Sequence, residues 1–210
     1  MYICAFILRS INKKMYKLLY LSFYDADRPP FAKKYHVEYF NIFGSSPENN
    51  ASPFKSRREY DVVIIGGGVA GIPTASDLCL YVPEIHDFIK SQPVVLGICY
   101  GMQLLYHLYY SKHVRALPFR HEKIDNISLS PKYPLGMEIS SLRVRFNHRY
   151  FCPDVSEGIV SQYYLPECDI VFPNVVQFAT NHYGCQFHFT NTDDQNHFLD
   201  VLLHLFEKKK

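Results

Sequence analysis

Hydrophobic residues are grouped along the chain in runs that predict strands, and stretches with helical or loop character separate these runs. Apolar and β-branched runs predict strands at Tyr16–Tyr24, Val37–Phe43, Tyr60–Ile65 and Val94–Ile98. The runs DVVIIG and PVVLGI are apolar throughout instead of alternating, which is typical of parallel strands that helices cover on both faces. The first half of the chain therefore predicts an α/β fold.

Helical spacing of apolar residues predicts helices near Tyr81–Lys90 and at Gly101–Tyr110, whereas Gly44–Arg58 is rich in Ser, Pro and Asn and predicts a loop. A further amphipathic helix closes the chain. Its apolar residues recur at helical spacing, at Phe198, Leu199, Leu202, Leu203 and Phe206.

The second half predicts shorter strands, which we expect to be antiparallel additions to the fold. They lie at Ile127–Leu129, Leu142–Phe146, Ile159–Tyr164 and Val175–Thr180, and a strand over YGCQFHF follows them. The predicted architecture is a mostly parallel central sheet flanked by helices, with a small antiparallel addition in the second half of the chain.

Length and composition favour one globular domain. The chain has 210 residues, of which 48% are hydrophobic, and this is enough to bury a core without disulfide bonds or metal ions. We interpret residues 1–14 as an N-terminal extension and residues 15–210 as the domain, and Met15 is an alternative functional start. The apolar run in the extension is too short to span a bilayer, so we expect no membrane association.

Charge and cysteine content exclude several classes of protein. The formal net charge is +2 and the basic residues are scattered, so we expect no nucleic-acid partner. The six cysteines lie far apart and form no CxxC pair, which favours a reducing, cytoplasmic compartment over a disulfide framework. The histidines show no ligand spacing, so no metal site is predicted.

One cysteine lies where a predicted strand meets a predicted helix. Gly97 and Gly101 flank Cys99 in a G-x-C-x-G pattern, the spacing of a nucleophile elbow at the carboxyl edge of a sheet. The positive end of the following helix should lower the pKa of the thiol and favour the thiolate. The alternative interpretation is a buried structural cysteine between two glycines that permit close packing.

A thiolate nucleophile needs a base and donors for an oxyanion. His188 comes at the end of a late strand, and the glycine-rich turn after Ile65 offers backbone N–H groups at the same edge. The turn has an alternative interpretation as a dinucleotide-binding fingerprint through Gly66, Gly68 and Gly71. The close proline and the mid-chain position disfavour that interpretation, and we predict no cofactor.

These motifs together resemble the class I, triad-type glutamine amidotransferases. The resemblance lies in DVVIIGGG, PVVLGICYGMQLL, FNHRY and GCQFHF, in the order of that family, and covers most of the chain from Tyr60 onward. Within the family the chain is most similar to the glutaminase part of GMP synthase. The resemblance implies a flavodoxin-like fold and glutamine as the substrate.

The resemblance also implies roles for individual residues. Cys99 matches the nucleophile and His188 the general base, and the backbone N–H groups of Gly68 and Tyr100 match the oxyanion hole.

On the substrate side, the resemblance puts Gln103 beside the bound glutamine and makes Asn147 and Tyr150 substrate-binding candidates. His148 in the same stretch does not match the catalytic histidine, and we expect it to be a partly exposed strand residue.

The third member of the triad departs from the family pattern. The family has glutamate two residues after the histidine, and Thr190 stands there in this chain. A threonine hydroxyl can accept a hydrogen bond from the imidazole but brings no negative charge to stabilise an imidazolium. Asp193 and Asp194 are alternative sources of a carboxylate.

Three functional hypotheses follow. The first is an enzyme that hydrolyses glutamine through a cysteine thioester and supplies ammonia to a separate ATP-dependent synthetase. The second is a catalytically impaired or inactive relative that serves as a binding or regulatory subunit. The third is a hydrolase of γ-glutamyl peptides, which the CYGMQ motif disfavours.

Overall fold

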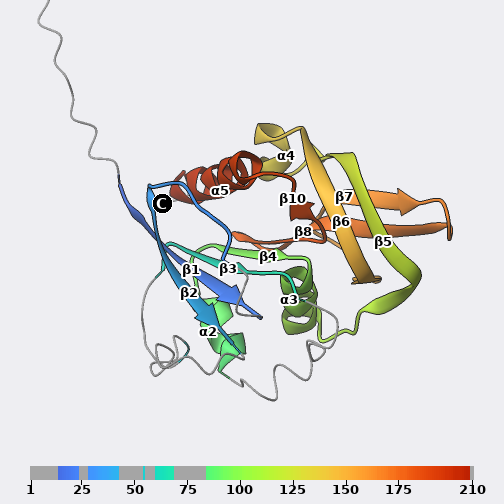
Figure 1. Ribbon diagram of the computed structural model, residues 1–210, viewed down its shortest axis with the longest axis horizontal. Helices are drawn as coiled ribbons and strands as arrows, with labels where there is room; N and C mark the ends of the chain where they lie inside the picture. Colours follow the sequence, from blue (N-terminus) through green and yellow to red (C-terminus); the bar gives the residue numbers. More distant parts are fainter. Residues whose placement is uncertain (1–13, 24–27, 43–53, 55–59, 69–83, 209–210) are drawn as a thin grey trace, which may run out of the picture.

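The computed structural model describes residues 14–23, 28–42, 54, 60–68 and 84–208, and a seven-stranded sheet organises them (Figure 1). The strands of this sheet are β1 (Tyr16–Ser22), β2 (Tyr35–Asn41), β3 (Val62–Ile65), β4 (Val95–Ile98), β7 (Ile159–Leu165), β8 (Ile170–Ala179) and β9 (His182–Cys185).

Their order across the sheet is β2-β1-β3-β4-β9-β8-β7. The pairs from β2 to β9 are parallel, whereas β8 and β7 continue the sheet in antiparallel pairing at one edge. All residues of β3 and β4 are buried, as their continuous apolar runs predicted. The mostly parallel central sheet is therefore confirmed.

Helices cover both faces of the sheet, in agreement with the α/β prediction (Figure 1). The helices are α2 (Ile85–Ser91), α3 (Tyr100–Tyr110), α4 (Pro134–Glu138) and α5 (Thr192–Glu207). Alternate residues of β1, β3 and β4 point to opposite faces: one set packs against α2 and α3, and the other packs against α5. The buried residues of α5 include the predicted Phe198, Leu199, Leu202 and Leu203.

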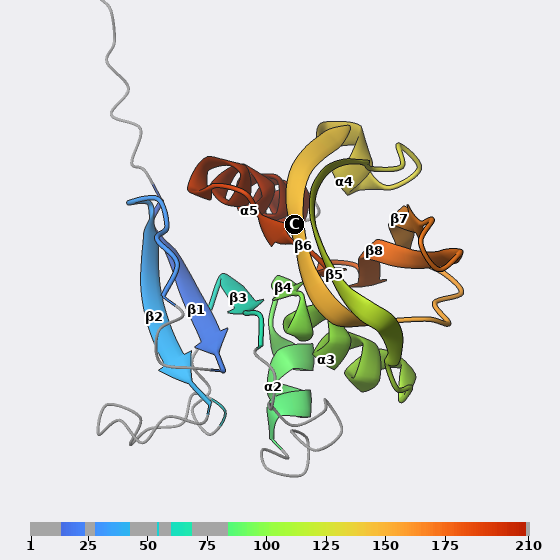
Figure 2. The same cartoon turned by 45° about the vertical axis from the view of Figure 1, so that its right-hand side comes forward.

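A second, smaller sheet is antiparallel, as predicted for the second half of the chain. It consists of β10 (His188–Phe189), β6 (Ser141–Phe151) and β5 (Arg115–Ser128), in that order. Figure 2 shows β5 and β6 as long curved strands beside the main sheet. Two of the predicted short strands, now β7 and β8, belong to the main sheet instead.

The predicted strand over YGCQFHF is wrong in one respect that matters for the site. It divides into β9, which joins the main sheet, and β10, which pairs with β6 in the small sheet. Gln186 and Phe187 lie between the two strands, and both side chains are fully buried. His188 therefore leaves the main sheet just beyond its carboxyl edge.

The segment between β1 and β2 lies against α5. The backbone N–H of Ala32 donates to Asn196 Oδ1 at 3.2 Å, and Lys34 and Tyr35 both hydrogen-bond Asp200. Residues 1–13, and all of the predicted loop 44–58 except Phe54, lie outside the described residues. In the part of the chain that the structure describes, no helix combines the length and apolar character needed to span a membrane.

Candidate active site

Cys99 occupies the turn between β4 and α3, in a backbone conformation that side chains rarely adopt. Its φ is 53° and its ψ is −101°. A Cβ at Gly101 would lie 2.1 Å from the backbone oxygen of Ile65, and a Cβ at Gly97 would lie 2.5 Å from the backbone of Gly101. Both glycines are therefore needed for close packing, and the strain at Cys99 is of the kind that gathers at functional sites.

The Cys99 sulfur is buried and receives hydrogen bonds from two directions. The backbone N–H of Tyr100 and the side-chain amide of Gln186, at 3.8 Å, both donate to it. These donors and the charge of Arg120 lower the thiol pKa, but burial outweighs them and raises the pKa to about 11. The expected low pKa is therefore not found: the start of α3 acts in the predicted direction and is overruled by desolvation.

His188 lies at the same edge of the sheet as Cys99. The backbone N–H of Cys99 donates to the oxygen of Cys185 at 2.7 Å, which joins the end of β4 to the end of β9. The His188 ring rests on the glycine-rich turn, where a Cβ at Gly67 would lie only 2.8 Å from its Cε1 atom. The nucleophile and base candidates are thus brought to one place by β4 and by the β9–β10 connection.

The imidazole itself has no hydrogen-bond partner among the described residues, neither Cys99 nor Thr190. Burial, together with the positive charge of Arg145, lowers the pKa of His188. The ring is therefore neutral at pH 7. Catalytic hydrogen bonds are often long in proteins without bound substrate, so this geometry is compatible with proton transfer once substrate is present.

Thr190 and Asp194 are engaged elsewhere. The Thr190 hydroxyl lies 3.2 Å from the oxygen of Arg143 and 3.3 Å from Asp194 Oδ2. Asn191 caps α5 by accepting the N–H of Asp194 at 2.8 Å, and its own amide donates to Asp194 Oδ2 at 2.8 Å. Asp194 thus stabilises the start of the helix, and Asp193 is exposed. The structure shows no carboxylate behind the histidine within the described residues.

The substrate-side residues meet across the gap between α3 and β6. Gln103 is buried one turn after Cys99, and its amide donates to the backbone oxygen of Tyr150 at 3.1 Å. The Tyr150 side chain is 47% exposed, so its observed contact with Gln103 is through the main chain. Asn147 Oδ1 accepts a hydrogen bond of 2.7 Å from Arg120 Nε.

His148 supports this contact and is buried, which corrects the expectation of a partly exposed residue. Its Nδ1 lies 3.0 Å from the oxygen of Tyr150, so Nδ1 must be the donor, and its Nε2 then accepts from Nδ1 of buried His121 at 3.3 Å. Burial lowers the pKa of His148 to about 4. A neutral histidine pair therefore fixes the carbonyl that binds Gln103.

The sequence interpretation missed Gln186, which contacts the sulfur directly. Gln186 and its neighbour Asn174 are both fully buried. Gln186 Oε1 and both polar atoms of the Asn174 side chain have no hydrogen-bond partner among the described residues. The backbone N–H of Gln186 donates to the oxygen of Asn174 at 2.9 Å. The available signal was a single amide inside an otherwise apolar run, in GCQFHF and in FPNVV.

The described residues offer few further groups for chemistry at this site. Gly68 follows β3 next to Gly67, and its role as an oxyanion donor stays a prediction. Among the described residues, no group of three or more His, Cys, Asp or Glu side chains is arranged to hold a metal ion. The described cysteines, Cys99, Cys152, Cys168 and Cys185, are free thiols.

Comparisons with known proteins bear on the family and the fold. The model of the family described as "Glutamine amidotransferase class-I" matches residues 34–202, which is most of the chain. A comparison with curated protein sequences gives no significant match.

Several solved structures share the fold. A Thermoplasma acidophilum protein, assigned as one of the subunits of GMP synthase, aligns with a TM-score of 0.63 at 13% identity, covering 93% of this chain and 96% of that one. The glutaminase domain of Trypanosoma brucei CTPS with bound acivicin gives 0.63 at 13% identity, covering 93% and 95%. A glutamine amidotransferase of Thermotoga maritima gives 0.57 at 15% identity, covering 93% and 85%.

Proposed function

The chain belongs to the class I glutamine amidotransferases, and on this premise we propose that it hydrolyses the side-chain amide of glutamine to glutamate and ammonia. The observation that carries the proposal is the pairing of a strained, positive-φ cysteine with a histidine at one edge of the sheet. The proposed site also keeps the buried Gln103 one turn after the nucleophile.

The proposed reaction has two steps. His188 takes the proton of Cys99, the sulfur attacks the amide carbon of glutamine, and the N–H groups of Gly68 and Tyr100 stabilise the oxyanion. The carbon–nitrogen bond then breaks, and ammonia leaves with the proton that His188 returns. In the second step His188 deprotonates a water molecule, which cleaves the thioester and releases glutamate and the thiol.

Before substrate binds, the Cys99 thiol and the His188 imidazole are both neutral in this proposal. The Cys99 pKa of about 11 keeps the thiol protonated at pH 7, and the lowered pKa of His188 keeps the ring able to accept a proton. The proton therefore has to move during attack instead of beforehand. Any group that stabilises the imidazolium will then speed the reaction directly.

The proposal also assigns residues that bind the rest of the substrate. Gln103 lies beside the bound glutamine, and Asn147 and Tyr150 are further substrate-binding residues in this proposal. Ammonia then passes to a separate ATP-dependent synthetase. The fold likeness to the Thermoplasma acidophilum GMP synthase protein supports a GMP-synthase-like assignment, in which glutaminase and synthetase are separate chains.

A second candidate function is that of a binding or regulatory subunit with impaired catalysis. The specific observation in its favour is Thr190, which stands at the position of the triad glutamate and donates to Arg143 or Asp194 instead of contacting His188. Such a protein would bind glutamine in the same pocket without releasing glutamate.

Glutamate release from glutamine separates these functions. The wild-type protein should form glutamate at a rate proportional to enzyme concentration, and Cys99→Ser should abolish release. Cys168→Ser is the matched control, because Cys168 is a free thiol far along the chain in the turn between β7 and β8, and it should keep the full rate. If folded wild-type protein binds glutamine but releases no glutamate, with or without a separate GMP synthetase chain, the second function holds.

A further inference from the structure

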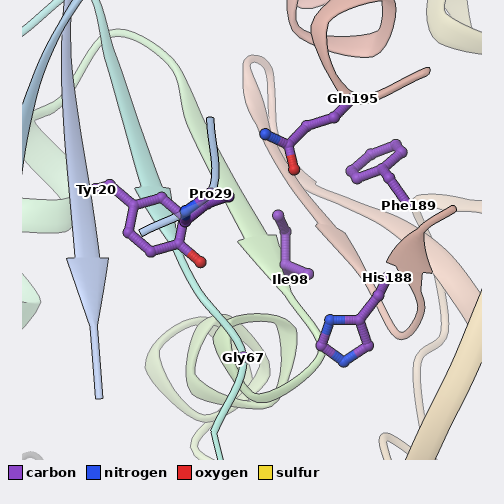
Figure 3. Close-up of a pocket in the computed structure, with 7 residues that line it drawn as sticks. All are labelled: Tyr20, Pro29, Gly67, Ile98, His188, Phe189 and Gln195. Atoms are coloured by element: carbon purple, nitrogen blue, oxygen red, sulfur yellow. The ribbon is translucent and has the colours of Figure 1, made fainter. Parts of the chain in front are cut away.

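The Cys99 sulfur has a side-chain partner that belongs to the protein interior. The Nε2 atom of Gln186 donates a hydrogen bond to Cys99 Sγ at 3.8 Å. Figure 3 shows the cavity that the His188 ring borders together with Gly67 and Ile98, and Gln186 is not among the residues that line it. Gln186 is fully buried, so its amide reaches the sulfur from within the protein.

The backbone holds Gln186 in place on both sides. The oxygen of Cys185 accepts the N–H of Cys99 at 2.7 Å, which joins the residue before Gln186 to the nucleophile turn. The N–H of Gln186 itself donates to the oxygen of Asn174 at 2.9 Å, which joins it to β8. The base of the Gln186 side chain is therefore fixed relative to Cys99.

The Gln186 amide is costly to bury if its role is only structural. Its Oε1 atom has no hydrogen-bond partner among the described residues, and its Nε2 atom donates to the Cys99 sulfur. A thiol is a weak acceptor, so this bond offsets little of the free energy that burial of an amide costs. Hydrogen bonds to a charged acceptor are about twice as strong. The amide therefore gains most when the sulfur is a thiolate.

Few other groups near the sulfur can balance a negative charge on it. The backbone N–H of the residue after Cys99 donates to the sulfur, and the positive charge of Arg120 acts on it from the small sheet. The thiols of Cys152 and Cys185 also interact with Cys99, but burial raises the pKa of both, so they are neutral at pH 7. Among these groups, Gln186 is the side chain that hydrogen-bonds the sulfur.

We propose that Gln186 is a catalytic residue of the glutaminase reaction, whose amide donates to the Cys99 sulfur while that sulfur carries negative charge. In the first step, the charge develops as His188 takes the thiol proton and the sulfur attacks the amide carbon of glutamine. In the second, the carbon–sulfur bond of the thioester breaks, its electron pair stays on the sulfur, and His188 then returns a proton. This role rests on the proposed function, whereas the hydrogen bond itself does not depend on turnover.

The first experiment measures how fast iodoacetamide alkylates Cys99 between pH 7 and pH 9, by mass spectrometry of the digested protein. Because the Cys99 pKa is about 11, the rate follows the thiolate fraction and should rise about ten-fold per pH unit. Gln186→Met keeps the size of the side chain and removes the amide. Its profile should lie about one pH unit higher, so labelling is about ten-fold slower at each pH.

Gln92→Met is the matched control for this labelling experiment. Gln92 is also a buried amide, but it ends α2 and donates to the oxygen of Phe88 instead of to the sulfur. The control should label Cys99 at the wild-type rate. Equal labelling of Cys99 in wild type and in Gln186→Met overturns the proposal.

Thermal unfolding separates this role from a structural one. Since the Gln186 amide hydrogen-bonds only the sulfur within the described structure, Gln186→Met should unfold at the wild-type temperature or higher. A lower unfolding temperature with wild-type labelling would assign Gln186 to core packing and overturn the proposal. Gln186→Asn, whose amide is one methylene too short to reach the sulfur, should also label slowly, and it decides the question if the methionine variant does not fold.

The glutaminase assay connects the hydrogen bond to catalysis. Gln186→Met should lower kcat by about ten-fold or more and change KM for glutamine much less, because the amide contacts the nucleophile and not the substrate. If the variant slows labelling but the wild type releases no glutamate, the sulfur contact stands and the proposed function fails. If the wild type releases glutamate and the variant equals it in kcat and in labelling, the role of Gln186 fails alone.

Discussion

The thiol side and the imidazole side of the site are built to different degrees. On the thiol side, two glycines fix the turn, Tyr100 and Gln186 hydrogen-bond the sulfur, and Gln103 is anchored to β6. On the imidazole side, His188 has no hydrogen-bond partner among the described residues. The described residues therefore hold the Cys99 thiol and the Gln103 amide through several contacts, whereas they leave the His188 imidazole without a hydrogen bond.

The largest effect is expected from breaking the thiol side. Gly101→Ala puts a methyl group 2.1 Å from the backbone oxygen of Ile65, and backbone cannot move aside as a side chain can. We expect a loss of about 3 kcal/mol in the free energy of unfolding, together with loss of glutaminase activity. Urea unfolding measures this loss. Ala116→Gly, at an exposed position of β5, is the control for exchanging alanine and glycine away from the Cys99 turn. An unchanged unfolding midpoint would show that the turn is not tightly packed.

Completing the imidazole side should give the next largest effect. Thr190→Glu, made together with Asp194→Asn to remove the like charge 3.3 Å away, restores a carboxylate at the family position. We expect kcat to rise by about a hundred-fold, because a carboxylate at the triad position orients the imidazole and stabilises its charge. The neutral Thr190→Gln with the same Asp194→Asn is the matched control. Equal rates for the two double variants would mean that charge behind His188 is not limiting.

A smaller effect is expected at the support of Gln103. His148→Ala removes the hydrogen bond to the Tyr150 oxygen and leaves space beside it. We expect KM for glutamine to rise by about ten-fold, with kcat changed much less, because binding and not chemistry is affected. His113→Ala, at an exposed histidine, should leave both constants unchanged. A fall in kcat at constant KM would place His148 in the chemistry instead.

The same contrast explains what could be predicted from the sequence. The strand–Cys99–helix turn depends on residues close together in the chain, so the G-x-C-x-G spacing was sufficient to place it. The division of the late strand was not predictable, because His188 pairs with Arg145, far away in sequence, and only that pairing draws it out of the main sheet. The high thiol pKa was missed for a similar reason, since burial is set by long-range packing around Cys99.

Covalent labelling of Cys99 by acivicin, a ligand found in the Trypanosoma brucei neighbour, tests the central claim most directly. Mass spectrometry of the digested protein should find one adduct, on Cys99, and glutamine should prevent it. Because the Cys99 pKa is raised to about 11 and His188 must take the proton, His188→Gln should slow labelling strongly at pH 7 and less at pH 10. Labelling of folded protein that avoids Cys99, or that ignores both glutamine and His188, would contradict the account.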